Sequence, residues 1–352
     1  MKGKQGMVCM GLLLVLSSCH TGKQITASGL QRKDFQTEVN GQHTDLFTLS
    51  NKQGMEVCIT NYGARVVSIL VPDRNGKRED VVCGFSTITE YMEQRQNFGS
   101  TVGRYIGRIL NARFTLDGVE YKLVPNNGKS GHISHGGNPG FADRIWKVEQ
   151  ADTHRVRLSY LSPDGENGFP GNLKVTLVYS LGEDDNALDL TYEATTDAPT
   201  VLNLSHHSFF NISGNFTKSV EDQQLWVDAD RFTPYDDKKC VTGEYLPVAG
   251  TPLDFRMPHA IGECIDADHP QLKVVNGYDH TWELNTKGDD TRPAAWVYDP
   301  ASGRKMEIFT TEPGMQIYTG NGLKGKMTGK RGIAYPFRSA VCFETMHFQD
   351  SP

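Results

Sequence analysis

The chain has 352 residues and lacks the features that nucleic-acid, nucleotide or membrane-surface binding requires. Its formal net charge is −6 and it contains no basic patch, so there is no electrostatic basis for binding nucleic acid or an anionic membrane. It has no P-loop and no Gly-x-Gly-x-x-Gly motif after a strand, which argues against nucleotide binding. Apolar residues make up 38% of the sequence and mean hydropathy is −0.46, values typical of a soluble globular protein.

Cysteine is scarce, with seven residues, and two of these lie near the N-terminus. The remaining five are an odd number, so at least one is unpaired, and none belongs to a Cys-x-x-Cys or Cys/His cluster with zinc spacing. They are expected to be small buried residues rather than a disulfide framework. These five are Cys58, Cys83, Cys240, Cys264 and Cys342.

Long apolar runs are absent except near the N-terminus, where residues 7–16 follow two lysines. That run is too short to span a bilayer as a mature helix. Leu16-Ser17-Ser18-Cys19 then resembles the cleavage box of bacterial lipoproteins. We therefore expect a signal peptide over residues 1–18, lipidation at Cys19, a polar tether over residues 19–31, and export to the periplasm or outer membrane. The alternative is an ordinary cleaved signal in which Cys19 has no role.

Helical periodicity is nearly absent, whereas short alternating or β-branched runs recur between turn signals. Asp117-Gly118 predicts a tight hairpin, and one short helix is predicted from Thr87 to Arg95, with Glu90 at the capping-box position. No repeat or linker follows residue 31. The pattern predicts one domain, residues 32–352, with an all-β fold, a large antiparallel β-sandwich. The predicted strands include residues 56–60, 66–71, 156–160, 173–180 and 187–193.

The most informative segment is 203–211, Asn-Leu-Ser-His-His-Ser-Phe-Phe-Asn. Adjacent residues on a strand point to opposite faces, so only one of His206 and His207 can enter a given pocket. Imidazole exchanges protons near neutral pH, and the surrounding amides, hydroxyls and rings suit a sugar. Taken alone, the segment is equally consistent with a surface strand that carries two exposed histidines.

Four other segments carry polar residues that, one by one, have ordinary structural explanations. They are a segment with two arginines four residues apart, Arg104 and Arg108; His135, which precedes a Gly pair; a turn with Asp279; and a strand with Gln316 that runs into a loop.

Together, the order and spacing of these segments resemble those of the aldose 1-epimerase (galactose mutarotase) family, from about residue 46 to residue 350. The resemblance implies a galactose mutarotase-like supersandwich that interconverts the α and β anomers of free hexoses such as glucose and galactose, without a cofactor. It also implies that His207 is the general acid and Glu344 the general base. The implied substrate-binding residues are Gly107, Arg108, His135, Phe209, Asp279 and Gln316.

The residues agree with this chemistry. Mutarotation removes a proton from the C1 hydroxyl and adds one to the ring oxygen; the C1–O5 bond then breaks, C1–C2 rotates, and the ring closes on the other face. One acid and one base on opposite sides of the hemiacetal are needed, with hydrogen bonds to hold the rest. A Glu/His pair meets this need, and no metal, nucleotide or covalent nucleophile is required.

Three features depart from the family pattern. Position 107 is glycine where the family often has asparagine, so one sugar contact is expected to be lost. Position 206 is histidine where the family usually has asparagine, and alternation directs His206 away from the pocket. The family also usually continues past residue 350 with a strand that closes the sandwich. Either the sequence is truncated before that strand or the strand is absent, and its absence would leave a sheet edge unpaired.

Two other hypotheses remain open. The first is a non-catalytic sugar-binding lipoprotein on the same sandwich, which the retained His207 and Glu344 oppose. The second is an epimerase of phosphorylated sugars, which would need extra cationic residues and is opposed by the acidic balance. In each case the expected partner is a small sugar, the chain is expected to be a monomer, and membrane contact is expected only through Cys19.

Overall fold

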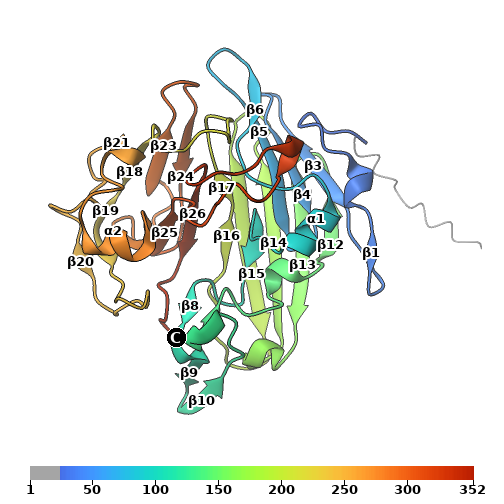
Figure 1. Ribbon diagram of the computed structural model, residues 1–352. Helices are drawn as coiled ribbons and strands as arrows, with labels where there is room; N and C mark the ends of the chain where they lie inside the picture. The colour runs from blue at the N-terminus through green and yellow to red at the C-terminus, as the bar shows by residue number, and fades with distance from the viewer. Residues whose placement is uncertain (1–23) are drawn as a thin grey trace, which may run out of the picture.

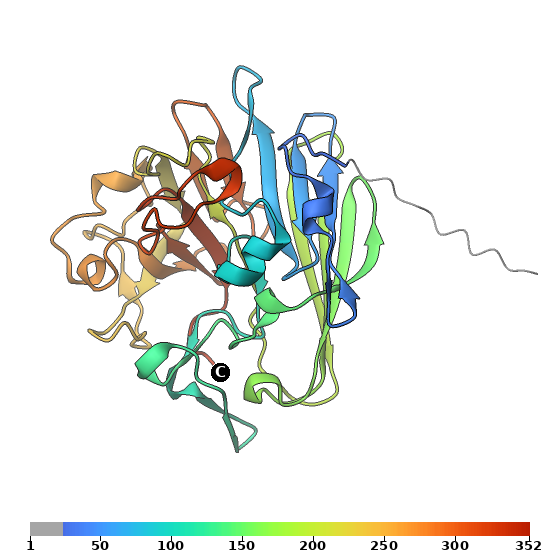
Figure 2. The same cartoon turned by 45° about the vertical axis from the view of Figure 1, so that its right-hand side comes forward.

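The computed structural model describes residues 24–352, so the predicted signal peptide and Cys19 lie outside the described residues. Over this range the chain is mostly antiparallel strand with few helices, which confirms the predicted all-β class (Figure 1). Four larger sheets pack as two pairs, one built by the first half of the chain and one mainly by the second half (Figure 2).

The first pair consists of two four-stranded antiparallel sheets. One contains β3 (Leu46–Ser50), β4 (Glu56–Thr60), β5 (Arg65–Pro72) and β6 (Arg78–Asp80) in that order. The other contains β12 (Lys147–Ala151), β13 (Arg155–Ser162), β14 (Leu173–Leu181) and β15 (Leu188–Thr196). Their facing apolar side chains, such as Val57, Val66, Leu158 and Val175, are fully buried in one core.

The second pair consists of a six-stranded sheet and a four-stranded sheet. The larger has the order β17 (Phe209–Phe210), β26 (Val341–Met346), β25 (Gly314–Tyr318), β22 (Asp279–Leu284), β19 (Ala229–Thr233) and β20 (Leu246–Pro247). The smaller has the order β21 (His259–Ala260), β18 (Gln224–Val227), β23 (Ala295–Tyr298) and β24 (Lys305–Ile308). A second core, with Trp282, Met315 and Ile317, fills the space between them.

Smaller elements surround these sheets. Two-stranded pairs are formed by β1 (Glu38–Val39) with β2 (Gln42–His43), β7 (Ser100–Val102) with β16 (Ser205–His207), β8 (Arg108–Ile109) with β11 (Ile133–Ser134), and β9 (Arg113–Leu116) with β10 (Val119–Lys122). The α-helices are α1 (Ile88–Gln94) and α2 (Pro270–Val275). Short 3-10 turns span Arg32–Phe35, Leu110–Ala112, Gly128–Ser130, Phe141–Asp143, Glu166–Gly168, Ile261–Glu263 and Lys330–Gly332.

The local predictions for the single helix and the hairpin are confirmed. The Thr87 hydroxyl accepts the Glu90 backbone N–H at 3.2 Å, and the Glu90 carboxylate accepts the Thr87 N–H at 2.9 Å, which completes a capping box before α1. Asp117 and Gly118 have φ values of 50° and 79°, as the tight turn between β9 and β10 requires. Helix α2, which begins at Pro270, was not predicted.

The tether does not extend to residue 31 as predicted. Thr26, Ser28 and Leu30 are buried, and the backbone N–H groups of Ala27 and Ser28 donate to the Glu56 carboxylate on β4 at 3.1 and 3.2 Å. Backbone N–H groups of this stretch therefore satisfy a buried carboxylate, and the stretch packs against the sheet.

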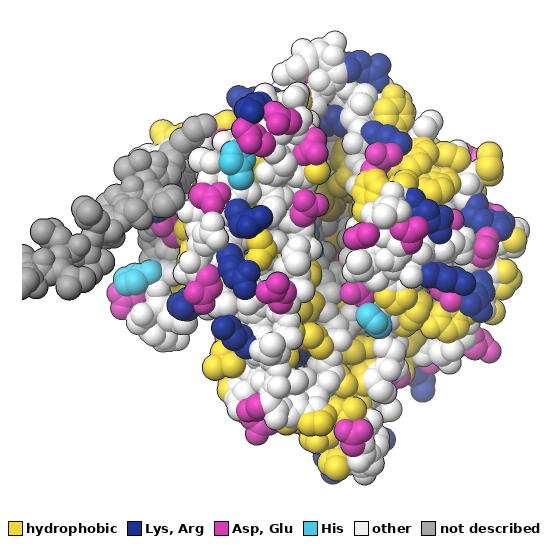
Figure 3. Space-filling model, turned by 180° about the vertical axis from the view of Figure 1, so that it is seen from behind, with side chains coloured by type: hydrophobic (Ala, Val, Ile, Leu, Met, Phe, Trp, Pro, Cys, Tyr) yellow, Lys and Arg dark blue, Asp and Glu magenta, His cyan; other side chains and the backbone are white. Residues whose placement is uncertain are grey.

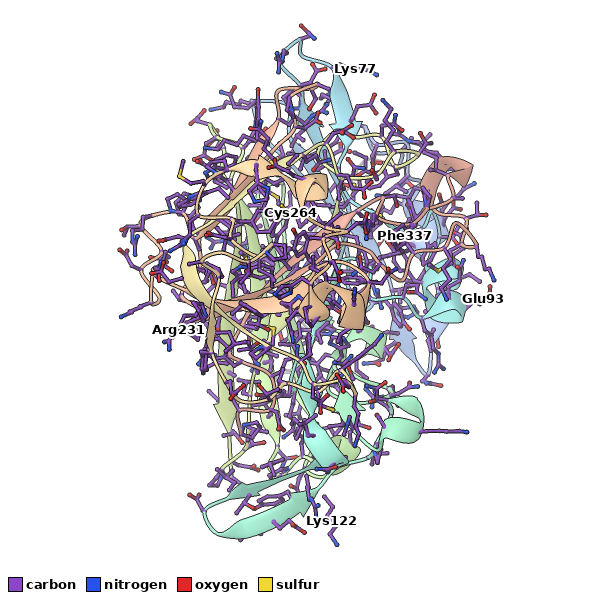
Figure 4. All side chains as sticks on the ribbon, turned by 60° about the vertical axis from the view of Figure 1, so that its left-hand side comes forward. Lys77, Glu93, Lys122, Arg231, Cys264 and Phe337 are labelled. Carbon is purple, nitrogen blue, oxygen red and sulfur yellow. The ribbon has the colours of Figure 1, made fainter. Side chains whose placement is uncertain are left out.

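On the face seen in Figure 3, acidic and basic side chains are interspersed. Lys77, Lys122 and Arg231 lie at separate edges of the molecule (Figure 4). No helix among residues 24–352 is long and apolar enough to cross a membrane. The missing C-terminal strand stays a prediction.

Candidate active site

The pocket lies on the side of the six-stranded sheet that faces away from the second core. The alternation of side-chain directions along a strand explains this position. On β25 and β26, Met315, Ile317 and Phe343 point into the core, whereas Gln316 and Glu344 point to the other side and are partners in the strand register. The segments around β8, β11 and β16 cover this polar face.

The cavity has a volume of about 190 Å³ and is lined by side chains from both halves of the chain. Its lining residues are Gly107, Arg108, Ser134, His135, His207, Tyr235, Asp279, Gln316, Tyr318, Glu344, Met346 and Gln349. All the residues implied by the resemblance are therefore at the cavity except Phe209.

A histidine and a carboxylate form the floor of the pocket. His207 Nε2 lies 3.3 Å from Glu344 Oε1, and both side chains are buried, with exposed fractions of 7% and 5%. Burial, followed by the nearby Asp279 charge, raises the pKa of Glu344 well above its ordinary value. Burial, followed by His135, lowers the pKa of His207 well below its ordinary value. Both shifts favour the uncharged forms, so the one proton that the pair shares is favoured on Glu344 and His207 is neutral.

His206 and Phe209 lie outside the cavity lining, near this pair. The His206 Nε2 and the Ser208 hydroxyl are 2.6 Å apart, and the His206 ring packs edge-on against Tyr179 of β14, on the far side from the pocket, as alternation predicted. Phe209 does not line the cavity as predicted. It stacks on the His207 imidazole with ring centroids 5.1 Å apart and an interplanar angle of 18°, and so sets the orientation of the imidazole.

Gln316 has a fixed amide orientation. Its Oε1 accepts the Thr281 hydroxyl at 2.5 Å, and its Nε2 donates to Asp279 Oδ1 at 2.7 Å and to the Tyr235 hydroxyl at 3.3 Å. Burial raises the pKa of Asp279, while the Gln316 amide opposes that rise. This network presents acceptors and donors at fixed positions, which suits the hydroxyl groups of a sugar.

Arg108 and His135 come from the covering segments. The Arg108 guanidinium donates to the Lys239 carbonyl at 2.7 Å and lies 6.0 Å from the centre of the Tyr235 ring. The Gly107 N–H donates to His135 Nδ1 at 3.4 Å, so the proton of neutral His135 is on Nε2. Burial, followed by the Arg108 charge, lowers the pKa of His135 to about 4, so it is a neutral donor at working pH.

The sequence reasoning missed five lining residues. Tyr318 and Met346 lie two positions after Gln316 and Glu344 on the same strands, so alternation could have found them. Ser134, Tyr235 and Gln349 had no comparable signal in the sequence.

One group of side chains could hold a metal ion. Among residues 24–352, His207, Cys342 and Glu344 are the single cluster in which three ligand atoms of His, Cys, Asp or Glu lie within 4.8 Å of one another. Two of these three are the acid–base candidates, and burial raises the pKa of the Cys342 thiol well above its ordinary value. A metal bound there would occupy the groups that proton transfer needs. The cysteines within residues 24–352 are all free.

A large β-sandwich with a polar pocket and a buried carboxyl–imidazole pair is an arrangement suited to acid–base chemistry on a polar substrate. Comparison with known proteins shows the family. The sequence matches the family model described as "Aldose 1-epimerase" over residues 45–352. It is 38% identical to galactose mutarotase of Sus scrofa over 305 residues, which cover 87% of this chain and 86% of that protein. It is 36% identical to aldose 1-epimerase of Escherichia coli K12 over 314 residues, or 89% of each chain.

Structural comparison agrees. The crystal structure of the GalM/aldose epimerase homologue from C. elegans superposes with a TM-score of 0.80 at 30% identity, and the match covers 88% of this chain and 91% of that one. The chain belongs to the aldose 1-epimerase family. Its activity is that of an isomerase, a mutarotase.

Proposed function

We propose that Glu344 and His207 interconvert the α and β anomers of free hexoses such as glucose and galactose. The observation that carries this proposal is the buried carboxyl–imidazole pair at the pocket floor, with 3.3 Å between Nε2 and Oε1. Two groups that share one proton suit a reaction that neither consumes nor releases one.

The steps balance as follows. The reactive form carries the proton of the pair on His207, so a proton first passes from Glu344 to His207 across the 3.3 Å between them. The Glu344 carboxylate then takes the proton from the C1 hydroxyl while protonated His207 gives its proton to the ring oxygen. The C1–O5 bond breaks, and C1–O1 becomes the aldehyde carbonyl. After C1–C2 rotates, the O5 hydroxyl attacks the other face of the carbonyl, His207 takes back its proton, and Glu344 returns one to O1. Both groups end in their starting states.

The rest of the pocket holds the sugar during this rotation. Asp279 and Gln316 hold hydroxyls through their fixed network, while Arg108 and the Nε2–H of His135 donate to sugar oxygens. Fixed partners lower the entropy cost of reaching the reactive geometry. Arg108 is also the only Lys or Arg side chain in the lining, which favours a free sugar over a sugar phosphate.

Polarimetry tests the assignment. Freshly dissolved α-D-glucose and α-D-galactose are followed to equilibrium with purified protein. His207→Ala and Glu344→Gln should each lower the rate by about 10²- to 10⁴-fold. His206→Asn is the matched control, because its side chain faces away from the pocket, and it should retain activity. Ordinary rates in either pocket variant would refute the assigned role. Sugar binding without any acceleration by the unaltered protein would favour the non-catalytic alternative.

We further propose that the protein is an exported, monomeric lipoprotein anchored through Cys19. The support is the sequence alone: Lys2, Lys4, the apolar run at residues 7–16 and the Leu-Ser-Ser-Cys box. Cys19→Ala should move the protein from the membrane fraction to the soluble fraction of a bacterial host. A variant that stays membrane-bound would contradict the lipid anchor.

A further inference from the structure

The Gln349 side chain lies in the space next to Gly107. A Cβ atom built on Gly107 would lie 2.6 Å from Gln349 Cγ, which is too short for a real contact, and 3.1 Å from its Cδ, which is tighter than most. Any larger residue at position 107 would therefore compete with Gln349 for one volume. Both positions line the cavity, although they lie far apart in the sequence.

The Gln349 amide is part of the pocket network. Its Nε2 donates to the Tyr235 hydroxyl at 2.9 Å and to Gln316 Oε1 at 3.3 Å. Its Oε1 accepts the Arg108 backbone N–H at 3.3 Å. An amide oxygen has two acceptor positions, so a sugar hydroxyl can donate to the second one.

The backbone around Gln349 is held firmly. The Asp350 N–H donates to the Arg108 carbonyl at 2.9 Å, and the Asp350 carboxylate accepts the Leu110 N–H at 2.9 Å. The Tyr105 hydroxyl donates to the Phe348 carbonyl at 2.8 Å. These bonds tie the segment after β26 to the β8 region and keep the Gln349 side chain aimed at the pocket.

We infer that Gln349 is a specificity-determining residue that accepts a hydrogen bond from one sugar hydroxyl, and that position 107 is glycine because Gln349 fills its side-chain space. This inference rests on the proposed function. It also revises the expectation that Gly107 costs the site a sugar contact, since an amide reaches the same place from the end of β26.

Gln349→Met tests the hydrogen bond, because methionine has similar length and volume but no amide. The variant should raise KM for galactose or glucose about 3- to 10-fold, the loss expected for one hydrogen bond, and leave kcat nearly unchanged. A residue that merely fills space would show no change in KM with methionine in its place.

A series of monodeoxy hexoses identifies the hydroxyl. With the unaltered enzyme, each missing hydroxyl that the site binds should lower kcat/KM. With Gln349→Met, the penalty should disappear for one of these sugars and persist for the others, because the partner of that hydroxyl is already gone. Unchanged penalties across the whole series would overturn the inference.

The shared volume is tested by exchange. Gly107 has a φ of 76°, a conformation that asparagine tolerates better than most residues. Gly107→Asn alone should lower kcat/KM more than 10-fold by displacing Gln349, and adding Gln349→Ala should restore it to within a few-fold of the unaltered enzyme. A double variant no better than Gly107→Asn would contradict a shared volume.

The outcomes separate this inference from the proposed function. If Gln349→Met has ordinary KM values while Glu344→Gln is inactive, the inference fails and the acid–base assignment stands. If Glu344→Gln is fully active, the proposed function fails whatever Gln349 does.

Discussion

Two buried acid–base pairs in this molecule have similar exposure but different surroundings. Lys330 Nζ lies 2.6 Å from Asp80 Oδ2, with exposed fractions of 8% and 9%, against 7% and 5% for His207 and Glu344. Lys330 also donates to the Val67 carbonyl at 2.5 Å, while Asp80 Oδ1 accepts two backbone N–H groups. His207 Nδ1, in contrast, has no hydrogen-bond partner.

The difference separates a structural pair from a functional one. A buried charge is tolerated when its partners satisfy it, as around Lys330 and Asp80. The pocket pair has fewer protein partners, and it borders the cavity in which a sugar can bind. Burial alone therefore does not distinguish the two pairs. Their hydrogen-bond partners and the neighbouring cavity do.

The largest expected effect tests whether the pocket pair acts as one unit. The double variant His207→Ala/Glu344→Gln should lose about as much activity as the worse single variant, roughly 10²- to 10⁴-fold. The reason is that the reaction needs the proton transfer at Glu344 and the transfer at His207 together. Polarimetry of the three variants gives the comparison. Losses that multiply would show that the two groups act independently.

Asp80→Ala tests the structural pair. Removing the carboxylate leaves the Lys330 ammonium buried without its charge partner, so the free energy of unfolding should fall by about 3–5 kcal/mol. Activity per folded molecule should stay unchanged, because this pair does not line the cavity. Denaturant unfolding and polarimetry of the same sample measure both. A stable variant with low activity would reverse the assignment of the two pairs.

Zinc offers a third test. Two ligands each about 2.0 Å from a tetrahedral zinc lie about 3.3 Å apart, which matches the 3.3 Å between His207 Nε2 and Glu344 Oε1. Micromolar Zn²⁺ should therefore inhibit, Cys342→Ala should weaken that inhibition about 10-fold or more, and EDTA should leave the untreated enzyme fully active. Cys264→Ala, away from the pocket, is the control. Activity lost to EDTA would mean that the enzyme requires a metal.

The smallest effect concerns stability and pH. Because the pKa of Glu344 is raised in the folded protein, its contribution to stability is full below the ordinary value of 4.5 and is lost as pH rises through the raised value. Glu344→Gln removes this loss, so its Tm should exceed that of the unaltered protein by a few degrees at pH 8 and by less at pH 5. Exposed Glu93→Gln should show no such trend. A constant difference across pH would show that Glu344 ionises normally.

Alternation along strands explains part of the agreement between the expected residues and the observed cavity lining. Gln316 and Glu344 stand on neighbouring strands with clear alternation, so their shared face followed from a period of two. Phe209 was given the wrong role, because a ring beside a catalytic histidine can line a pocket or support the imidazole from behind. Leu30 was assigned to a tether because the residues against which it packs lie on distant strands and cannot be inferred from a polar stretch.

The sequence by itself determined the all-β class and the family, because alternation, turn residues and motif order are local properties of the chain. Only the tertiary structure decided that His207 and Glu344 touch, that burial moves their pKa values in opposite directions, and that Gln349 occupies the space left by Gly107. Those facts depend on segments more than 100 residues apart meeting at one sheet face, where distance and desolvation, rather than sequence order, set the chemistry.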